Sequence, residues 1–197
     1  MIKLLLGVVY AIAIFLDLPL IIITKLGLLV FRSDIPYSAC AQLLSLIPDY
    51  PGIFLRVAFY RFALHKFSLS GTIGFGTIVT KTGARIGKNY FMGGNNLIGL
   101  VDIGDNVVIA SGVHILSGRR QHNFSNVKTE IMDGDVHLSL INIGDDVFIG
   151  DKCIVMADIG EKSIVGAGSV VVKPIPPYSV VAGNPARVVR QRTPVTK

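Results

Sequence analysis

The sequence predicts a mainly β protein, a parallel β-helix of six-residue repeats preceded by an apolar helical segment. Two observations indicate this fold. An aliphatic residue followed by a small one recurs at nearly every sixth position over residues 71–192, and residues 1–31 are almost continuously apolar. A period of six fits neither a helix nor a lone strand, whose side chains repeat every ~3.6 and ~2 residues. It fits short strands that turn a corner after each inward-pointing aliphatic residue.

The repeat runs in two blocks. In the block that starts at Ile73 the steps are 6, 7, 6, 6, 5, 6 and 6 residues, and in the block that starts at Ile143 they are 6, 6, 4, 6 and 6. Nine of the twelve steps are six, so chance is a poor explanation. We expect the four-residue step to be a tightened corner, and stability to come from the stacking of coils. The predicted inward positions are Ile73, Val79, Ile86, Met92, Ile98, Ile103, Ile109, Ile115, Ile143, Ile149, Val155, Ile159, Val165 and Val171.

Length and composition limit the functional classes. The 197 residues, 51% of them hydrophobic, allow one main domain with a good core and a small appendage. A net charge of +6 indicates anionic partners, such as a phosphorylated cofactor or a membrane surface. No run of basic residues with interleaved aromatics is present, so we expect no nucleic acid partner. Cys40 and Cys153 lie at no metal-ligand spacing, which argues against a disulfide framework or a zinc site.

Residues 1–31 are too apolar for the start of a soluble enzyme, although Asp17, Pro19 and Lys25 interrupt them. A secretory signal peptide is one interpretation, but no small-residue cleavage site follows. A single membrane span would place Asp17 and Pro19 near the bilayer centre, where a charge is costly and proline kinks a helix. We therefore favour a membrane-associated helical hairpin that turns at these two residues over a single helix.

Residues 32–70 predict two helices that are separated at Pro48 and Pro51. The second helix, near residues 53–64, is rich in aromatic side chains and carries basic residues along it and after it. This composition favours a helix at the membrane interface, with its rings at headgroup depth and its cations near anionic lipid. The alternative is a helix that packs on the end of the β-helix and caps its open coil.

The six-residue spacing stops after Ser117 and resumes at Ile143. Between them the chain is polar, charged and aperiodic, and a loop of this length inside a compact repeat domain is typical of a functional segment. The predicted organisation is a membrane-associated segment at 1–31, interfacial or capping helices at 32–70, a β-helix domain at 71–192 with a protruding loop at 118–141, and a tail at 193–197.

The second block and the residues after it resemble a known family. VGAGSVV at 165–171, followed by AGNPARVVR at 182–190, is similar to signatures of the hexapeptide-repeat acyltransferases, which include maltose, galactoside, serine and bacterial polysaccharide O-acetyltransferases. Residues 46–64 resemble, less specifically, the lead-in of membrane-associated polysaccharide O-acetyltransferases. The resemblance, which covers roughly residues 71–192, implies a left-handed β-helix, a homotrimer, acetyl-coenzyme A (acetyl-CoA) as donor and a saccharide as acceptor. It also implies direct transfer without a covalent enzyme intermediate.

One histidine suffices for the chemistry that the resemblance implies. Neutral imidazole is suited near pH 7 to taking the proton of an alcohol as it attacks a thioester. The resemblance places the catalytic histidine at His122, at the start of the polar loop. His114 is the alternative, in a coil where alternation would point its side chain outward. We expect His65 at a helix end and His137 in the solvated part of the loop.

The other candidate residues also come from the resemblance. Asn95 lies where the family often holds an acceptor-binding asparagine, and Asn96 is the alternative. Asn95 could equally be a corner residue in the left-handed conformation. The pantetheine arm is expected along small residues of the coils, at Gly150, Ala167 and Gly168, which allow close approach. The candidates for binding the CoA phosphates are Lys173, Arg187 and Arg190. The alternative is that these three residues are solvated surface charges.

Because CoA is cytosolic, this interpretation requires the coils to lie on the cytoplasmic face of the inner membrane. Basic residues that flank the apolar segment agree with the positive-inside rule. They are Lys3, Arg32, Arg56, Arg61 and Lys66.

Two alternatives from other functional classes remain open. A zinc enzyme similar to the γ-class carbonic anhydrases would share the left-handed β-helix, but it needs three convergent histidines. The H-x4-H pair that such enzymes carry is absent here, so we expect no metal. A β-helix without activity could instead act as a scaffold at a membrane. The AGNPA signature and the histidine in the polar loop argue against a scaffold.

Overall fold

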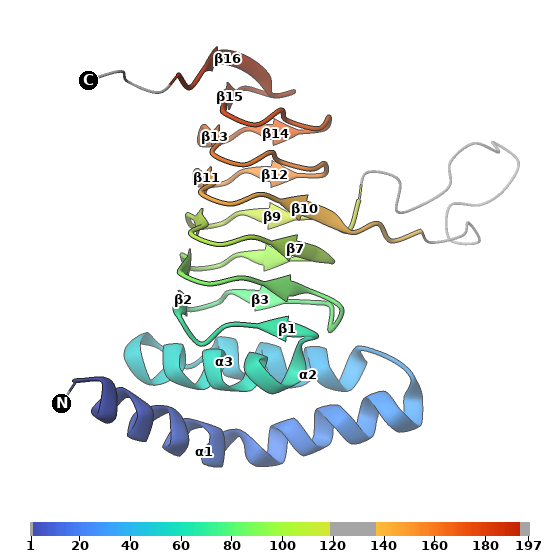
Figure 1. The fold of residues 1–197 in the computed structure, drawn as a ribbon. Coiled ribbons are helices and arrows are strands. Elements are labelled where there is room, and N and C mark those ends of the chain that lie inside the picture. The colour runs from blue at the N-terminus through green and yellow to red at the C-terminus, as the bar shows by residue number, and fades with distance from the viewer. Residues whose placement is uncertain (1, 119–136, 194–197) are drawn as a thin grey trace, which may run out of the picture.

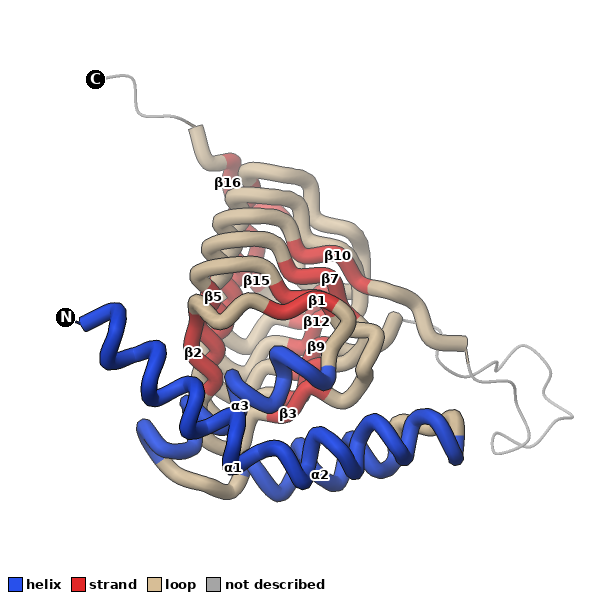
Figure 2. The backbone as a smooth tube through the Cα atoms, turned by 60° about the horizontal axis from the view of Figure 1, so that its bottom comes forward, coloured by secondary structure: helices blue, strands red, loops and turns tan. Residues whose placement is uncertain are grey.

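In the computed structural model the chain forms a parallel β-helix that stands on a layer of three helices (Figure 1). The structure describes residues 2–118 and 137–193. The coils stack along one axis, and the helices lie across the N-terminal end of that axis, as Figure 2 shows from a second direction. The β-helix predicted from the repeat is confirmed.

Three parallel sheets, named A, B and C here, run along the β-helix, and successive strands pass from A to B to C. Sheet A consists of β1 (Lys66–Phe67), β4 (Arg85–Ile86), β7 (Val101–Ile103) and β10 (Ile141–Ile143). Sheet B consists of β2 (Gly71–Ile73), β5 (Tyr90–Met92), β8 (Val108–Ile109), β11 (Phe148–Ile149), β13 (Ile164–Val165), β15 (Ser179–Ala182) and the antiparallel β16 (Arg187–Gln191). Sheet C consists of β3 (Ile78–Val79), β6 (Leu97–Ile98), β9 (His114–Ile115), β12 (Ile154–Val155) and β14 (Val170–Val171).

The repeat positions are the inward positions of these strands. All fourteen predicted aliphatic residues are buried, and equivalent residues stack in register, as Ile149 does on Val165. Full burial of such a side chain contributes about 1.5–3 kcal/mol. The column begins earlier than predicted, because Phe67 in β1 is also buried and lies six residues before Ile73. Phe67 was not predicted as an inward residue because the spacing was followed through aliphatic residues only.

Departures from the six-residue spacing all fall at one corner, between sheet C and sheet A. From A to B and from B to C the inward residues are always six apart, whereas the short steps from C to A are 7, 5, 4 and 4 residues. The tightened corner predicted between Val155 and Ile159 is confirmed by the pairing of Ile159 with Ile143. The loop at 118–141 is inserted at the same corner. This corner therefore accepts changes in length, while the other two corners keep the register.

Each of the two regular corners has a residue with positive φ three positions after the inward residue. Only glycine adopts this conformation freely, and for other L-residues it costs about 1–2 kcal/mol. Between sheets A and B these residues are Asn89, Asn106, Asp146, Lys162 and Tyr178. Between sheets B and C they are Gly76, Asn95, Gly112, Lys152 and Gly168.

Helices α2 (Ile35–Ser45) and α3 (Asp49–Ala63) cover the open end of the first coil. Phe59 and Tyr60 of α3 are fully buried and pack against Tyr37 of α2. The Tyr37 hydroxyl donates to the carbonyl of Val79 at 2.7 Å, and the Val79 amide donates to the Tyr60 hydroxyl at 3.1 Å. These rings seal the first coil, as the capping alternative expects, while Phe62 on the same helix is 41% exposed.

Arg56 of α3 is a cation with 0% exposure. Its Nε donates to the carbonyl of Ile73 at 3.0 Å, and its Nη1 donates to the carbonyls of Leu44 and Ile47 at 3.0 and 2.7 Å. The last two carbonyls lie at the C-terminal end of α2, where the helix dipole favours a cation. Arg56 therefore ties α2 and α3 to the first coil, and it is not one of the surface charges that the positive-inside pattern assumed.

Helix α1 (Ile2–Phe31) is continuous and contains Pro19. It does not turn back at Asp17 and Pro19, so the structure has a single helix in place of the favoured hairpin. The part from Leu5 to Phe31 is long and apolar enough to cross a membrane, by length and composition. In the fold it packs lengthwise against α2 and α3 (Figure 1), and Asp17 is buried.

Candidate functional site

Several candidate residues lie at the corner between sheets B and C. Gly150 occupies this corner in one coil, and Ala167 and Gly168 occupy it in the next. The Gly168 amide donates to the carbonyl of Asp151 at 2.8 Å, which joins the two coils there. Asn95 lies at the same corner, two coils closer to the helices than Gly150 and three coils closer than Ala167 and Gly168. The structure thus brings together the residues proposed for the pantetheine arm and aligns Asn95 with them.

His114 begins β9 in sheet C, just after this corner. Its side chain is exposed and points outward, as strand alternation predicted, and its amide donates to the carbonyl of Cys153 at 2.9 Å. Its register neighbours in the sheet are Leu97 and Ile154, which are also exposed. The alternative base therefore stands on an outer face between two aliphatic side chains.

His122, the preferred base, lies outside the described residues. The described ends of its loop meet at the corner between sheets C and A, where the Ser139 amide donates to the carbonyl of Ser117 at 2.8 Å. The Ser117 hydroxyl accepts the amide of Leu100 at 2.8 Å, which fixes this end of the loop on the neighbouring coil. The loop thus starts beside sheet C, the sheet that carries His114.

Asn96 does not face solvent and is 1% exposed. Its Nδ2 donates to the carbonyl of Gly93 at 3.0 Å, and its Oδ1 accepts the amide of Val113 at 2.7 Å. The Asn96 amide donates to the Thr77 hydroxyl at 3.1 Å. This side chain joins coils inside the corner, and its burial keeps it from an acceptor in solution. Asn95 is exposed, and its φ of 58° is that of a corner residue.

Small residues at this corner let the coils approach closely and leave open space beside them. A methyl group added to Gly150 would lie 2.6 Å from the amide nitrogen of Ala167, so Gly150 is required by the packing. At Gly168 nothing lies within 4 Å of an added methyl group, and a slender ligand can approach the backbone there. Lys152 adds an exposed cation that we did not select from the sequence. Its position three residues after Ile149, equivalent to that of Gly168 after Val165, could have indicated it.

The three cations proposed for the CoA phosphates are exposed but lie on different sides of the last coil. Arg187 on β16 pairs with Ala182, next to the corner between sheets B and C. Arg190 pairs with Val180, within sheet B. Lys173 follows β14, toward the corner between sheets C and A. Arg187 is therefore the one of these three that adjoins the small-residue corner.

The outer faces of sheets B and C are apolar, and that of sheet A is polar. The residue just before each inward position shows this contrast, a signal in the sequence that we did not use. On sheet B these residues are Thr72, Phe91, Val108, Phe148, Ile164 and Val180, of which only Thr72 is polar. On sheet C they are Ile78, Leu97, His114, Ile154 and Val170. On sheet A they are Lys66, Arg85, Asp102 and Asn142, and Arg85 pairs with Asp102 at 3.4 Å.

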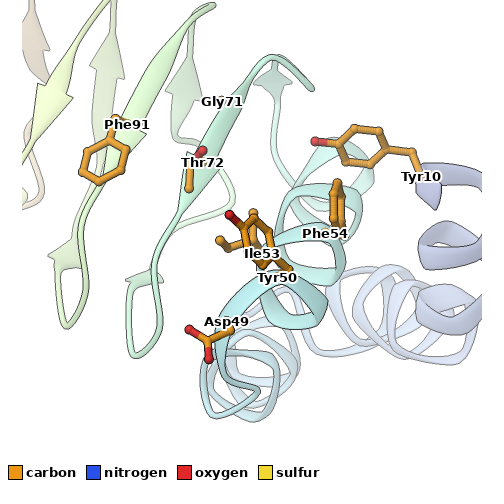
Figure 3. A pocket seen from close by; sticks show the side chains of 8 residues that line it. All are labelled: Tyr10, Asp49, Tyr50, Ile53, Phe54, Gly71, Thr72 and Phe91. Carbon is orange, nitrogen blue, oxygen red and sulfur yellow. The ribbon is translucent and has the colours of Figure 1, made fainter. Parts of the chain in front are cut away.

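A cleft of about 520 Å³ lies at the base of sheet B, away from the candidate residues (Figure 3). It lies between α1, α3 and the first coils, and none of the candidate residues lines it. Its lining contains no cation, so it does not suit the phosphates of CoA. The lining residues are Tyr10, Asp49, Tyr50, Ile53, Phe54, Gly71, Thr72 and Phe91.

Neither cysteine has the surroundings of a nucleophile, because both are buried. The Cys153 thiol donates to the carbonyl of Gly166 at 3.1 Å inside the corner, and burial raises the pKa of this thiol. A raised pKa disfavours the thiolate that would be needed for attack. Within residues 2–118 and 137–193, no three His, Cys, Asp or Glu side chains come together in a way that could hold a metal ion.

A family model described as "Hexapeptide repeat of succinyl-transferase" matches residues 83–117 and 141–173, the coils on either side of the loop. A comparison with curated protein sequences finds no match. Among solved structures, the chain is similar to a maltose O-acetyltransferase from Clostridium difficile 630, with 26% identity and a TM-score of 0.71, over 80% of this chain and 85% of that one.

Two further structures share the fold. A hexapeptide-repeat acetyltransferase from Vibrio cholerae has 23% identity and a TM-score of 0.66, over 82% of this chain and 92% of that one. It has also been solved in complex with acetyl-CoA. A galactoside acetyltransferase in complex with CoA has 24% identity and a TM-score of 0.65, over 85% of this chain and 83% of that one.

Proposed function

Because the chain belongs to the hexapeptide-repeat acyltransferases, we propose that it transfers an acetyl group from acetyl-CoA to a hydroxyl of a saccharide. The observation that carries the proposal is the likeness to a maltose O-acetyltransferase over 80% of this chain. The complexes of similar structures with acetyl-CoA and CoA support acetyl-CoA as the donor.

The reaction is a direct transfer with a histidine as general base. Imidazole takes the proton of the acceptor hydroxyl while the oxygen attacks the thioester carbonyl, and a tetrahedral oxyanion forms. Backbone N–H groups can stabilise that oxyanion. When it collapses, the C–S bond breaks and the imidazolium returns the proton to the sulfur of CoA. His122 is the proposed base, and His114 is the alternative.

The pantetheine arm is proposed to run along the corner between sheets B and C, beside Gly150, Ala167 and Gly168. Open space at Gly168 supports this path, and the cations Lys152 and Arg187 adjoin it. Asn95, exposed at the same corner, is the proposed acceptor contact. The charge of these cations suits the phosphates of CoA.

The working form is proposed to be a homotrimer. A ring closes when one patch of a subunit meets a different patch of the next, and sheets B and C supply two apolar patches. In this arrangement His114 on sheet C faces sheet B of the neighbouring subunit, so two subunits share one site.

The proposed location is the cytoplasmic face of the inner membrane, with a lipid-linked or polysaccharide precursor as acceptor. Cytosolic CoA requires the coils on that side. Exposed Lys25, Arg32, Arg61 and Lys66 near the helical layer support attraction to anionic lipid. Arg32, Arg61 and Lys66 belong to the positive-inside pattern predicted from the sequence, whereas Arg56 of that pattern is buried.

The test is release of free CoA thiol from acetyl-CoA by purified protein in detergent, with and without a membrane lipid extract. The parent is compared with His122→Ala and His114→Ala, and His137→Ala serves as a matched control, because His137 is exposed and belongs to the same loop.

We expect extract-dependent release that His122→Ala abolishes and that the other two variants retain. Loss in His114→Ala alone would move the base to sheet C. If neither the parent nor any variant binds or consumes acetyl-CoA, the acyltransferase proposal fails. If a water-soluble glycan supports release but the extract does not, the chemistry stands and the membrane-bound acceptor is wrong.

A further inference from the structure

The two sides of α1 differ in a way that bears on how the protein meets a membrane. Within residues 5–31, the buried residues of α1 are Ile21 and four small or polar residues, Ala13, Asp17, Thr24 and Gly27. The opposite side carries large apolar residues, of which Phe15 and Leu29 are 74% and 76% exposed. A helix on the surface of a water-soluble domain has the reverse distribution.

The apolar side is continuous from Leu5 to Leu29, and between them it includes Ile12, Phe15, Ile22 and Leu26. A contiguous exposed apolar stripe of this kind marks a site that contacts another protein or a membrane. Helices that pack together in lipid place small residues toward their protein neighbours and large apolar residues toward the acyl chains. Close packing at Gly27, where an added methyl group would lie 2.5 Å from Cβ of Pro36, fits that pattern. The chemistry of this side therefore matches lipid acyl chains.

The orientation of α1 follows from its attachment at both ends. Near the N-terminus, the ring of Tyr10 meets Phe54 edge-on at 5.3 Å, and its hydroxyl donates to the carbonyl of Leu69 at 3.2 Å. Near the C-terminus, Gly27 lies against Pro36. Helix α1 thus lies across the axis along which the coils stack (Figures 1 and 2). If α1 crossed a bilayer in this fold, α2, α3 and one side of the β-helix would enter the hydrocarbon with it, at a large cost in desolvated charge.

We propose that α1 lies flat in one leaflet, with its apolar side among the acyl chains and the axis of the coils along the membrane normal. The inference rests on the proposed membrane location and adds its geometry. A helix of 30 residues is about 45 Å long, more than the ~30 Å hydrocarbon core, and a flat helix needs no match between these lengths. Asp17 then faces protein and not lipid.

This geometry also agrees with the proposed trimer. Three subunits related by an axis along the coils would hold their α1 helices in one plane, against the same leaflet. Exposed Lys25, Arg32 and Lys66 belong to the same end of the molecule and suit anionic headgroups.

The test uses a single introduced tryptophan, because the chain has none. Full-length Leu5→Trp, Phe15→Trp and Leu29→Trp are reconstituted into vesicles of phosphatidylethanolamine and phosphatidylglycerol whose acyl chains carry bromine at defined carbons. A flat helix predicts that bromine at the same shallow carbons causes the greatest loss of fluorescence in all three variants. Val189→Trp on β16, at the far end of the β-helix, is the matched control and should keep its fluorescence.

A maximum at deep carbons for Phe15→Trp, with shallow maxima for Leu5→Trp and Leu29→Trp, would establish a crossing helix and overturn the proposal. Absence of quenching in all three variants would also overturn the proposal. It would show that a second copy of this chain or another protein covers the apolar side of α1. Thermal unfolding like that of the parent shows that each variant is folded. Acyl transfer is not measured, so the depth profile and the proposed activity can fail independently.

Discussion

His114 and Ile154 are register partners on the neighbouring strands β9 and β12, and both side chains point away from the core. Leu97, the partner of His114 on its other side, is exposed and apolar as well. An apolar outer face of this kind is typical of a surface that contacts another protein. Sheet C therefore combines an apolar outer face with a candidate base, as the proposed site shared between two subunits requires.

Replacing Phe148 on sheet B or Ile154 on sheet C by glutamate should dissociate the proposed trimer, because each change places a charge in an apolar contact. Acyl transfer should fall with the loss of the trimer, while the coils stay folded. Analytical ultracentrifugation in detergent measures the mass, and circular dichroism measures the fold.

Lys66→Glu on polar sheet A is the matched control and should remain trimeric. Trimers that persist in both Phe148→Glu and Ile154→Glu would show that sheets B and C do not form the interface.

The β-helix could be predicted because one column of side chains encodes it. A six-residue step places each inward residue on its equivalent, as it places Ile149 on Val165, so the spacing carries the register. Phe67 was missed because the search followed aliphatic residues only. The spacing also shows where length varies, but it gives no structure for the loop that holds His122, since the loop has no period.

The helical layer was predicted less well, because composition does not tell which side of a helix is buried. Pro19 and Asp17 suggested a turn by local rules alone. In the fold Pro19 is exposed and Asp17 packs against protein, so one helix accommodates both. The same limit applies to Asn96 in the candidate site. The sequence suggests a polar surface residue, but Asn96 is 1% exposed.

Arg56→Met should lower the free energy of unfolding by about 3 kcal/mol or more. The change leaves the buried carbonyls of Ile47 and Ile73 without the guanidinium, at about 1–3 kcal/mol for each group left unsatisfied, while the carbonyl of Leu44 keeps the amide of Ile47 at 3.3 Å. Urea unfolding followed by circular dichroism measures the loss. Arg61→Met, on the exposed side of the same helix, should change stability by less than about 0.5 kcal/mol. Equal losses in the two variants would refute a special role for Arg56.

Asn96→Ala should cost about 1–3 kcal/mol of stability, because the buried amide of Val113 loses its acceptor. Asn95→Gly should leave stability nearly unchanged, since glycine adopts the positive φ of this corner without strain. If Asn95 contacts the acceptor, as proposed, KM for the acceptor should rise in Asn95→Gly while KM for acetyl-CoA stays constant. An unchanged acceptor KM would leave Asn95 as a corner residue only.

Alkaline pH should unfold the N-terminal end of the β-helix through its buried tyrosines. Burial raises the pKa of Tyr60 to about 12, against smaller opposing effects of the Val79 amide and Arg56, and burial also raises the pKa values of Tyr37 and Tyr90. In the unfolded chain a phenol loses its proton near pH ~10. Stability should therefore be constant below about pH 10, where both states keep the proton.

Above about pH 10 only the unfolded chain gains by ionising, so stability should fall by about 1.4 kcal/mol per pH unit for each such tyrosine, until the pH reaches the pKa of the folded state. Tyrosinate absorbance and circular dichroism recorded in one titration measure both events. The absorbance of the buried tyrosines should appear only as the circular dichroism signal is lost. If all six tyrosines ionise while the coils remain intact, these side chains are open to solvent and the seal between α2, α3 and the first coil is wrong.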